Sequence, residues 1–408
     1  MRPPFVAGAS LLLTLALVTG ACTDEEEPGP PGPSDPVSSG PPMTVSPTLA
    51  EPERFTVAFL QSPDGEEAAD RVVPAFQAAR LAFSNAELVA GLPVDVEVVA
   101  FDTDGTPTSA AELAARIATT PDVIAAIGAP GLIEQATLGD ALDAAGVPWV
   151  SLSGSGSGLG DREWTGWRRL VADQQVQGQV LAAAVDDVRS SRRGVCLLGD
   201  ASSAARSILG VVAGSLDAEV VLRVPVGEEQ ASVADAALAV LESGCGVVAW
   251  GGEGSAAAAL RRQLAEDGAR GVAFVGTDRI RDDAYVDAVG PAGEGTLATC
   301  PCVDVTTSTD LAAQRFIQDY QSEFGLPPGP YAVEAWDAAR MIVDALRAGA
   351  RTREAVRAAL ETTTSLDGLA VIYRFGPGGD LAEPASAVRI SRVEGGRWLE
   401  LATSAPRR

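Results

Sequence analysis

A run of small hydroxyl and glycine residues, Ser151-Leu-Ser-Gly-Ser-Gly-Ser157, directly follows a segment that we predict to be a β-strand. Loops at the carboxyl ends of parallel strands present unpaired backbone N–H groups, and nearby hydroxyls add further hydrogen-bond donors. Such a loop can hold a carboxylate. It does not match the Gly-x-Ser-x-Gly pattern of a nucleophile elbow, so serine catalysis is not indicated. A flexible Gly/Ser connector is the alternative interpretation.

Paired carboxylates are the other candidates for chemistry, because two acids can hydrolyse a glycoside. Asp102 and Asp104 stand two residues apart in the segment Asp102-Thr-Asp-Gly105. This segment follows a predicted strand and precedes a predicted helix, so turn formation explains its Asp and Gly residues well. A carboxylate-based exported hydrolase is therefore the third of the functions that we consider.

The composition excludes several classes of site. The sequence contains neither histidine nor lysine, so every basic side chain is an arginine. Ser-His-Asp triads, histidine zinc sites, Schiff-base lysines and phosphate-loop lysines all require residues that are missing. The net charge of -25 disfavours nucleic acid, whose phosphates select clustered cations. We expect no enzyme activity, no metal, no cofactor and no nucleic-acid partner.

The N-terminus has the anatomy of an export signal. Residues 1–21 carry one positive charge at Arg2, a short apolar run over residues 11–18, and small residues directly before Cys22. The apolar run is too short to cross about 30 Å of hydrocarbon. The segment Thr19-Gly-Ala-Cys22 resembles a bacterial lipobox, in which the cysteine is acylated, although Leu is usual where Thr19 stands. We predict a lipid anchor on Cys22; a plain secretory peptide is the alternative.

Acidic residues, Pro, Gly and Ser dominate residues 22–53, which show no apolar periodicity. Such a segment buries too little apolar surface to offset its ordering entropy. We predict a disordered tether that holds a folded body at the outer face of the cell membrane.

Four cysteines follow the tether. An even number in an exported protein favours disulfides, and four cysteines allow three pairings, which the sequence leaves open. Cys300 and Cys302 are spaced too tightly for an easy bridge with each other, and no second motif of metal ligands accompanies them. The candidates for structural bridges are Cys196, Cys245, Cys300 and Cys302.

The body alternates short β-branched runs with longer Ala-rich amphipathic stretches, which indicates βαβ units and an α/β fold with mostly parallel sheets. In the first half we predict strands over residues 55–60, 94–101, 123–127 and 149–152, and helices over residues 66–87, 109–119 and 132–145. The pattern restarts with strands over residues 194–199, 220–224, 246–250 and 272–276, each followed by a helical stretch. Two lobes of one architecture are implied.

The alternation of predicted strands and helices stops near the C-terminus. A helix pair over residues 310–324 and 331–349 precedes strands over residues 369–376, 387–393 and 396–398, which we interpret as hairpin strands. Because these pieces have no sheet of their own, the chain must cross between the lobes more than once.

The order of motifs from Phe55 to Leu401 resembles the substrate-binding proteins of branched-chain amino acid ABC transporters, the leucine-binding protein family with the type I periplasmic-binding-protein fold. The motifs that carry the resemblance are residues 122–128, 145–153, 276–278, 293–297, 329–331, 334–339 and 374–380. The resemblance implies two doubly wound lobes joined by three crossovers. We place these near Leu170, Cys302 and Leu369, so that residues 54–169 and 303–368 form lobe 1 and residues 170–302 and 369–408 form lobe 2.

The resemblance also assigns ligand-binding positions. Its carboxylate-binding loop falls on Ser153, Gly154 and Ser155, and its ammonium-binding acid falls on Asp278. A charge-assisted contact of this kind is strong in a closed cleft. Asp is also a preferred helix N-cap, so capping is the alternative role for Asp278.

Two departures from the family pattern leave the identity of the ligand open. The loop after the third strand, Gly128-Ala-Pro-Gly-Leu-Ile133, lacks hydroxyls, so its contact must come from the backbone of Gly131 and Leu132. The segment after Asp200 lacks the aromatic residue that many members carry. Gln61, after the first strand, is a marginal further candidate.

Function follows from this resemblance as an expectation. The first hypothesis is an extracytoplasmic, lipid-anchored protein that captures a small polar ligand, an amino acid or a related compound, for an ABC permease. The alternative is a ligand-sensing lipoprotein of the same fold that signals to a membrane partner.

Overall fold

The computed structural model describes residues 52–61, 65–85, 89–104, 106–132, 134–154, 156–189 and 193–401, with the side chains of residues 65–69 left out. The predicted signal peptide, Cys22 and the tether up to residue 51 lie outside the described residues, as does Ser155. Within the described part, no helix combines the length and apolar character that a bilayer crossing needs.

The first sheet contains five parallel strands in the order β2-β1-β3-β4-β5. Successive side chains of a strand point to opposite faces, and β1 shows this directly. Val57 and Phe59 belong to one apolar cluster, while Ala58 and Leu60 belong to another on the opposite face. The strands are β1 (Glu53–Gln61), β2 (Val94–Asp102), β3 (Val123–Gly128), β4 (Trp149–Ser151) and β5 (Trp167–Arg169).

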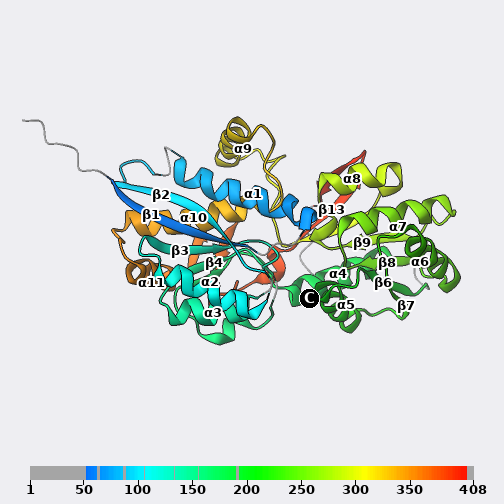
Figure 1. Ribbon diagram of the computed structural model, residues 1–408. Coiled ribbons are helices and arrows are strands. Elements are labelled where there is room, and N and C mark those ends of the chain that lie inside the picture. The colour runs from blue at the N-terminus through cyan, green and yellow to red at the C-terminus, as the bar shows by residue number, and fades with distance from the viewer. Residues whose placement is uncertain are drawn as a thin grey trace, which may run out of the picture. The chain divides into compact units, whose positions relative to one another are not determined.

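Helices cover both faces of this sheet (Figure 1). One cluster joins Val57 and Phe59 to α1, α9, α10 and α11, and the other joins Ala58 and Leu60 to α2 and α3. Both faces are therefore buried, as expected of a parallel sheet. The helices are α1 (Gly65–Ser84), α2 (Pro107–Thr119), α3 (Gln135–Ala144), α9 (Leu311–Phe324), α10 (Ala332–Arg347) and α11 (Arg353–Thr362).

The second sheet has seven strands in the order β14-β13-β10-β9-β8-β6-β7. Strands β6 to β10 are parallel, and the hairpin β13–β14 adds two antiparallel strands at one edge. These strands are β6 (Val195–Gly199), β7 (Val220–Pro225), β8 (Val247–Trp250), β9 (Ala273–Gly276), β10 (Leu297–Cys300), β13 (Arg389–Glu394) and β14 (Arg397–Glu400). The terminal hairpin was predicted from the sequence.

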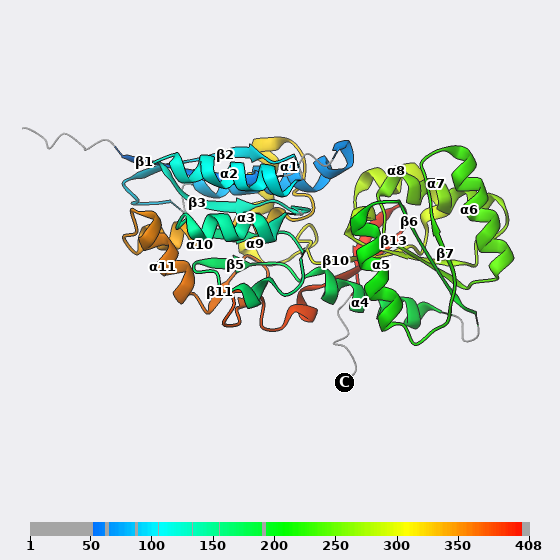
Figure 2. The same cartoon turned by 60° about the horizontal axis from the view of Figure 1, so that its bottom comes forward.

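The second sheet also has helices on both faces (Figure 2). Cys196 and Leu198 of β6 pack with α6, α7 and α8, whereas Val195 and Leu197 pack with α4 and α5. These helices are α4 (Gln174–Val188), α5 (Ser203–Ser215), α6 (Gln230–Ser243), α7 (Gly254–Glu266) and α8 (Asp283–Val289). The predicted α/β fold with two doubly wound, mostly parallel lobes is confirmed.

A small third sheet pairs β11 (Ser365–Asp367) with β12 (Ile372–Arg374). Leu366, Tyr373 and Phe375 pack into the cluster of the first lobe. The positions of the crossovers stay a proposal. For the third one, this packing favours a place after Leu381, which also contacts that cluster, rather than near Leu369.

The cysteines form two bridges, Cys196–Cys245 and Cys300–Cys302. The expectation that Cys300 and Cys302 are too close in sequence to pair was wrong. The backbone bends at Pro301 and Cys302, and the two Cα atoms lie 5.0 Å apart, within the range that a disulfide requires.

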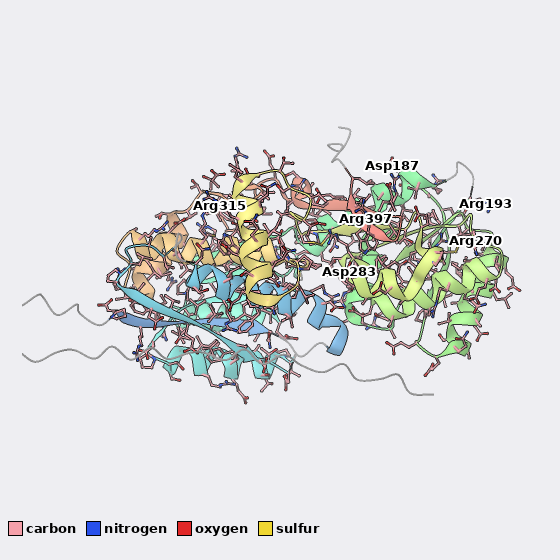
Figure 3. The ribbon with its side chains drawn as sticks, turned by 90° about the horizontal axis from the view of Figure 1, so that it is seen from above. Asp187, Arg193, Arg270, Asp283, Arg315 and Arg397 are labelled. Carbon is pink, nitrogen blue, oxygen red and sulfur yellow. A yellow bond between two sulfur atoms is a disulfide. The ribbon has the colours of Figure 1, made fainter. Side chains whose placement is uncertain are left out.

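Charges of both signs are spread over the surface. Figure 3 shows exposed acids and arginines on helices, strands and loops of the two lobes, among them Asp187, Arg193, Arg270, Asp283, Arg315 and Arg397. Acids outnumber bases in the whole chain, 55 to 30. This balance supports solubility rather than phosphate binding.

Candidate functional site

Asp278 is the acid at which the two lobes meet. It begins the short 3₁₀ helix η2 (Asp278–Ile280) directly after β9 in the second lobe. Its Oδ1 accepts a hydrogen bond from Gln177 Nε2 at 2.7 Å, and its Oδ2 accepts one from Tyr331 Oη at 2.8 Å. Gln177 lies on α4 of the second lobe, whereas Tyr331 packs in the core of the first.

The alternative role of Asp278 as a helix cap was wrong. The N-cap of α8 is Asp282, whose Oδ1 accepts a hydrogen bond from the Tyr285 backbone N–H at 2.7 Å. The N-cap of η2 is Thr277. The carboxylate of Asp278 is therefore available for contacts across the boundary between the lobes.

Tyr331 holds its hydroxyl toward Asp278 from a strained backbone. Its φ of 64° lies in the left-handed region, which a non-glycine residue adopts at a cost of about 1–3 kcal/mol. Gly329, two residues earlier, approaches α1 so closely that an added Cβ would lie 2.8 Å from Pro74. Burial first, and then the Asp278 charge, hold the pKa of Tyr331 well above its usual range. Its hydroxyl thus stays protonated and acts as a donor.

A second set of contacts between the lobes involves arginines. Arg71 of α1 lies 3.4 Å from Glu253, measured from Nη2 to Oε2, and Glu253 also forms an ion pair with Arg279. Glu253 precedes α7, and its backbone N–H donates to Asp200 Oδ2 at 2.9 Å. Arg71 belongs to the first lobe, and the other two residues belong to the second.

The predicted carboxylate loop is held together by its own hydrogen bonds. Ser153 is buried; its Oγ donates to the Leu132 carbonyl at 2.9 Å, and its backbone N–H donates to Ser151 Oγ at 3.1 Å. Gly154 must be small, because a Cβ there would lie 2.8 Å from the Ala172 carbonyl oxygen. The structure thus brings Ser153, Gly154 and Leu132 together. Their contact with a ligand stays a prediction.

The start of α4 connects this loop to Asp278. The backbone N–H of Gln174 donates to the Gly154 carbonyl at 2.7 Å. Gln177 follows three residues later, on the same face of the helix, and donates to Asp278. Both predicted parts of the site, the loop and the acid, therefore contact the first turn of one helix.

The other residues predicted for the site, Gln61, Gly131 and Ser155, have no described contact with Asp278. Gln61 is half-buried, and its Nε2 donates to Asp102 Oδ1 at 2.7 Å, which ties together the ends of β1 and β2. Gly131 adopts a φ of 79°, where glycine is favoured, in the turn before Leu132. Ser155 lies outside the described residues.

Sequence reasoning missed Arg71, Gln177 and Glu253 as members of the site. Each belongs to a different segment, and no local spacing connects them. Tyr331 did carry a signal, since it ends the Gly-Pro-Tyr motif of the family resemblance. Within the described residues, no group of three His, Cys, Asp or Glu side chains could hold a metal ion.

A cavity of about 1330 Å³ lies elsewhere. It is lined by α4, the segment after Cys300 and the strands near the C-terminus, with Val180, Ala183, Val303, Tyr373 and Arg389 among its residues. None of the predicted ligand residues lines it. Its polar lining includes the exposed Asp187 and Glu383 and the buried Glu334. The candidate site stays at Asp278, where the predicted acid is bonded from both lobes.

The chain resembles known proteins over most of its described length. A family model described as periplasmic binding protein matches residues 56–397. No curated protein matches the chain.

Solved structures with the same fold include transport proteins. The branched-chain amino acid transporter substrate-binding protein of Streptococcus pneumoniae, in complex with isoleucine, is 18% identical with a TM-score of 0.71, and the match covers 86% of this chain and 100% of that one. A leucine-binding protein of Thermotoga maritima is 20% identical with a TM-score of 0.69, covering 86% and 98%. A solute-binding protein of Rhodopseudomonas palustris, in complex with benzoate, is 16% identical with a TM-score of 0.68, covering 86% and 97%. At these identities the likeness shows the fold.

Proposed function

Because the chain belongs to the periplasmic binding protein family, we propose that it captures an amino acid or a related small solute between its lobes for an ABC permease. The observation that carries this proposal is the position of Asp278. Its two carboxylate oxygens are bonded from different lobes, by Gln177 and by Tyr331. A carboxylate so placed can pair with a ligand ammonium group while the lobes are held together.

The structures with isoleucine and benzoate support a carboxylate as one recognised group, because both ligands carry one. For this chain we assign it to the loops at the ends of β3 and β4, near Gly131, Leu132, Ser153, Gly154 and Ser155. The amino group would lie toward Asp278, beyond the start of α4.

The test is a binding screen on the mature protein with two variants. A ligand that binds only the folded state raises the melting temperature, so at least one L-amino acid is expected to do so. Asp278→Asn keeps the size of the side chain and removes its charge. We expect it to weaken binding more than about tenfold, because it removes the partner of a desolvated ammonium group.

The matched control is Asp283→Asn, an exposed acid on α8, which should leave affinity unchanged. Equal affinities in wild type and Asp278→Asn would refute the assigned role of Asp278. A complete absence of thermal shifts with amino acids and small carboxylates would refute capture of such solutes.

We propose further that the mature protein is anchored by acylated Cys22 and presents its lobes to the permease outside the membrane. The support is the order of charge, apolar run, small residues and cysteine at the N-terminus. Cys22→Ser should move the protein from the membrane fraction to the soluble exported fraction. An unchanged membrane association would contradict the anchor.

A further inference from the structure

Arg71 carries a hydrogen-bond donor that the described structure does not use. The residue is 5% exposed. Its Nη2 contacts Glu253, but its Nη1 is buried and has no hydrogen-bond partner among the described residues. A buried charged donor without a partner is costly, and arginine cannot relieve that cost by losing its proton. A missing acceptor at this atom is therefore the simplest explanation.

Glu253 does not pair with Arg71 alone. Glu253 is shared by two guanidinium groups, those of Arg71 and Arg279. Glu253 cannot move fully to Arg71, because Arg279 holds its other oxygen and Asp200 holds its backbone N–H.

The guanidinium group lies within electrostatic reach of the candidate site. The positive charge of Arg71 acts on Tyr331, the residue whose hydroxyl donates to Asp278. Arg71 comes from α1 and Tyr331 from the turn before α10, and these two helices pack against each other. The donor thus belongs to the same part of the boundary between the lobes as the proposed ammonium-binding acid.

We propose that the ligand carries a second acidic group, beyond an α-carboxylate, and that Arg71 Nη1 receives it. This inference rests on the proposed function: the β3 and β4 loops would take the α-carboxylate and Asp278 the ammonium group. The ligand class is then an acidic amino acid or a closely related dicarboxylate. A carboxylate there would accept a charge-assisted hydrogen bond from the unpaired Nη1.

The experiment compares acidic amino acids with neutral counterparts of similar size. Binding of L-aspartate, L-glutamate and L-2-aminoadipate is measured by calorimetry against L-asparagine, L-glutamine and L-norleucine. Wild-type protein is expected to bind at least one acid more than about tenfold tighter than its neutral counterpart. Arg71→Gln should reduce that ratio to about one, whereas Arg71→Lys, which keeps the charge, should retain part of it.

The control is Arg54→Gln, which changes an arginine whose side chain is 81% exposed and should leave the ratio unaltered. Thermal unfolding of each variant shows whether it is folded, and Arg71→Lys serves as the test if Arg71→Gln is not. Tighter binding of neutral amino acids, with the ratio unchanged in the Arg71 variants, would overturn the acidic ligand and leave the proposed function standing. Failure of every compound to bind would overturn both.

Discussion

Two buried carboxyl groups lie one turn apart on α10, and both are attached to other segments. Glu334 Oε1 accepts a hydrogen bond from the Val303 backbone N–H at 2.8 Å. Asp337 accepts hydrogen bonds from the Leu369 backbone N–H at 2.9 Å and from Tyr373 Oη at 3.1 Å. Burial is the first cause that raises the pKa of Glu334 to about 8 and that of Asp337 to about 7.

These raised pKa values make stability depend on pH in a defined direction. Between about pH 4.5 and pH 8 the unfolded chain has lost the Glu334 proton and the folded protein has kept it, so the free energy of unfolding falls as pH rises. The slope from this one group is at most about 1.4 kcal/mol per pH unit.

The variant Glu334→Gln has no carboxyl proton to gain or lose. Its side-chain oxygen can still accept the hydrogen bond from the Val303 backbone N–H. We expect the variant to lose less stability than the wild type between pH 5 and pH 8, as measured by denaturant unfolding at several pH values. The neighbouring charges of Arg281 and Asp337 are present in both proteins. Glu323→Gln, at an exposed position on α9, should follow the wild-type curve. Parallel curves for wild type and Glu334→Gln would contradict the raised pKa.

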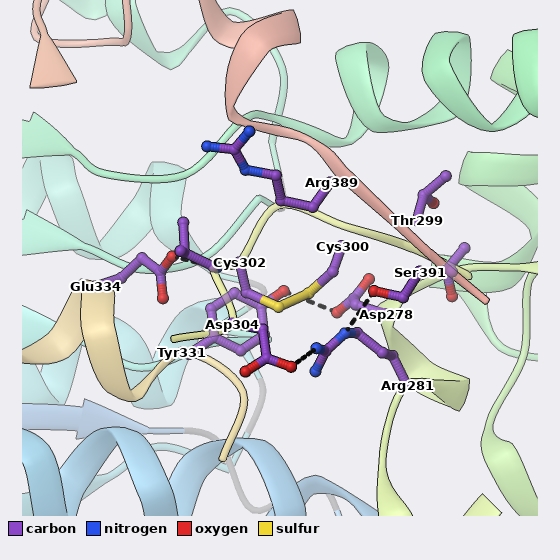
Figure 4. The surroundings of a disulfide bond; sticks show 12 residues. Asp278, Arg281, Thr299, Cys300, Cys302, Asp304, Tyr331, Glu334, Arg389 and Ser391 are labelled. Atoms are coloured by element: carbon purple, nitrogen blue, oxygen red, sulfur yellow. Dashed lines mark hydrogen bonds and ion pairs between the residues drawn. A yellow bond between two sulfur atoms is a disulfide. The ribbon is translucent and has the colours of Figure 1, made fainter. Parts of the chain in front are cut away.

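At the scale of elements, the two disulfides close loops of very different length. Cys196–Cys245 spans 49 residues and joins β6 to the turn before β8, whereas Cys300–Cys302 spans two. The chain-entropy model gives about 4 kcal/mol of stabilisation for the first bridge and under about 2 kcal/mol for the second. The short bridge lies at the end of β10, and Asp278, Tyr331 and Glu334 are among the residues around it (Figure 4).

The two bridges should therefore affect different properties: Cys196–Cys245 the stability of the fold, and Cys300–Cys302 the binding of ligand. We expect Cys196→Ala/Cys245→Ala to lower the melting temperature strongly. The variant Cys300→Ser/Cys302→Ser should change it little but should alter the rate of ligand dissociation, because it frees the segment that follows β10. Thermal unfolding and stopped-flow dissociation measure the two effects. Unaltered affinity and dissociation in the second variant would rule out a role for the short bridge in lobe motion.

Most elements could be predicted from the sequence because β-branched runs alternate with Ala-rich amphipathic stretches. The four β-branched runs before residue 153 and the four that restart at residue 194 all form strands. Strand β5 reads Trp-Arg-Arg and strand β10 reads Leu-Ala-Thr-Cys, so neither stands out as a β-branched run. Helix α11 was missed, although the sequence carries signals for it: Thr352 as its N-cap, and Val356 and Leu360 on one apolar face.

The site was less predictable than the fold. Asp278 and Ser153 follow strands, and the sequence marks the ends of strands. Arg71, Gln177 and Glu253 come from three separate elements, and their contacts depend on how the lobes meet. Sequence periodicity describes which face of an element is buried, but it contains nothing about which charged side chains meet across a boundary.

Polar contacts join the two lobes of the molecule at the site. Arg71 with Glu253 and Tyr331 with Asp278 each join side chains from different lobes. The side chains of Arg71 and Glu253 are only 6% and 24% exposed, so solvent screens their pairing little. A contact made only while the lobes touch shifts the population toward that arrangement.

Glu253→Gln should therefore favour separated lobes in the absence of ligand. If the Arg71–Glu253 ion pair contributes about 1 kcal/mol, its loss changes the ratio of joined to separated lobes about fivefold. Small-angle X-ray scattering is expected to show a larger radius of gyration for unliganded Glu253→Gln than for wild type. Glu323→Gln is again the control. A radius identical to that of the wild type would show that this ion pair does not hold the lobes together.

Helix α10 has a mechanical consequence for the whole chain. Its Glu334 accepts a hydrogen bond from the Val303 backbone N–H, in the segment that follows β10, and its Asp337 accepts one from Leu369, in the β11–β12 hairpin. In the proposed division into lobes, these two segments lie next to the second and third crossovers. We propose that a shift of this one helix displaces both segments together. Two of the three proposed connections would then move as one, and the proposed connection near Leu170 would move independently of them.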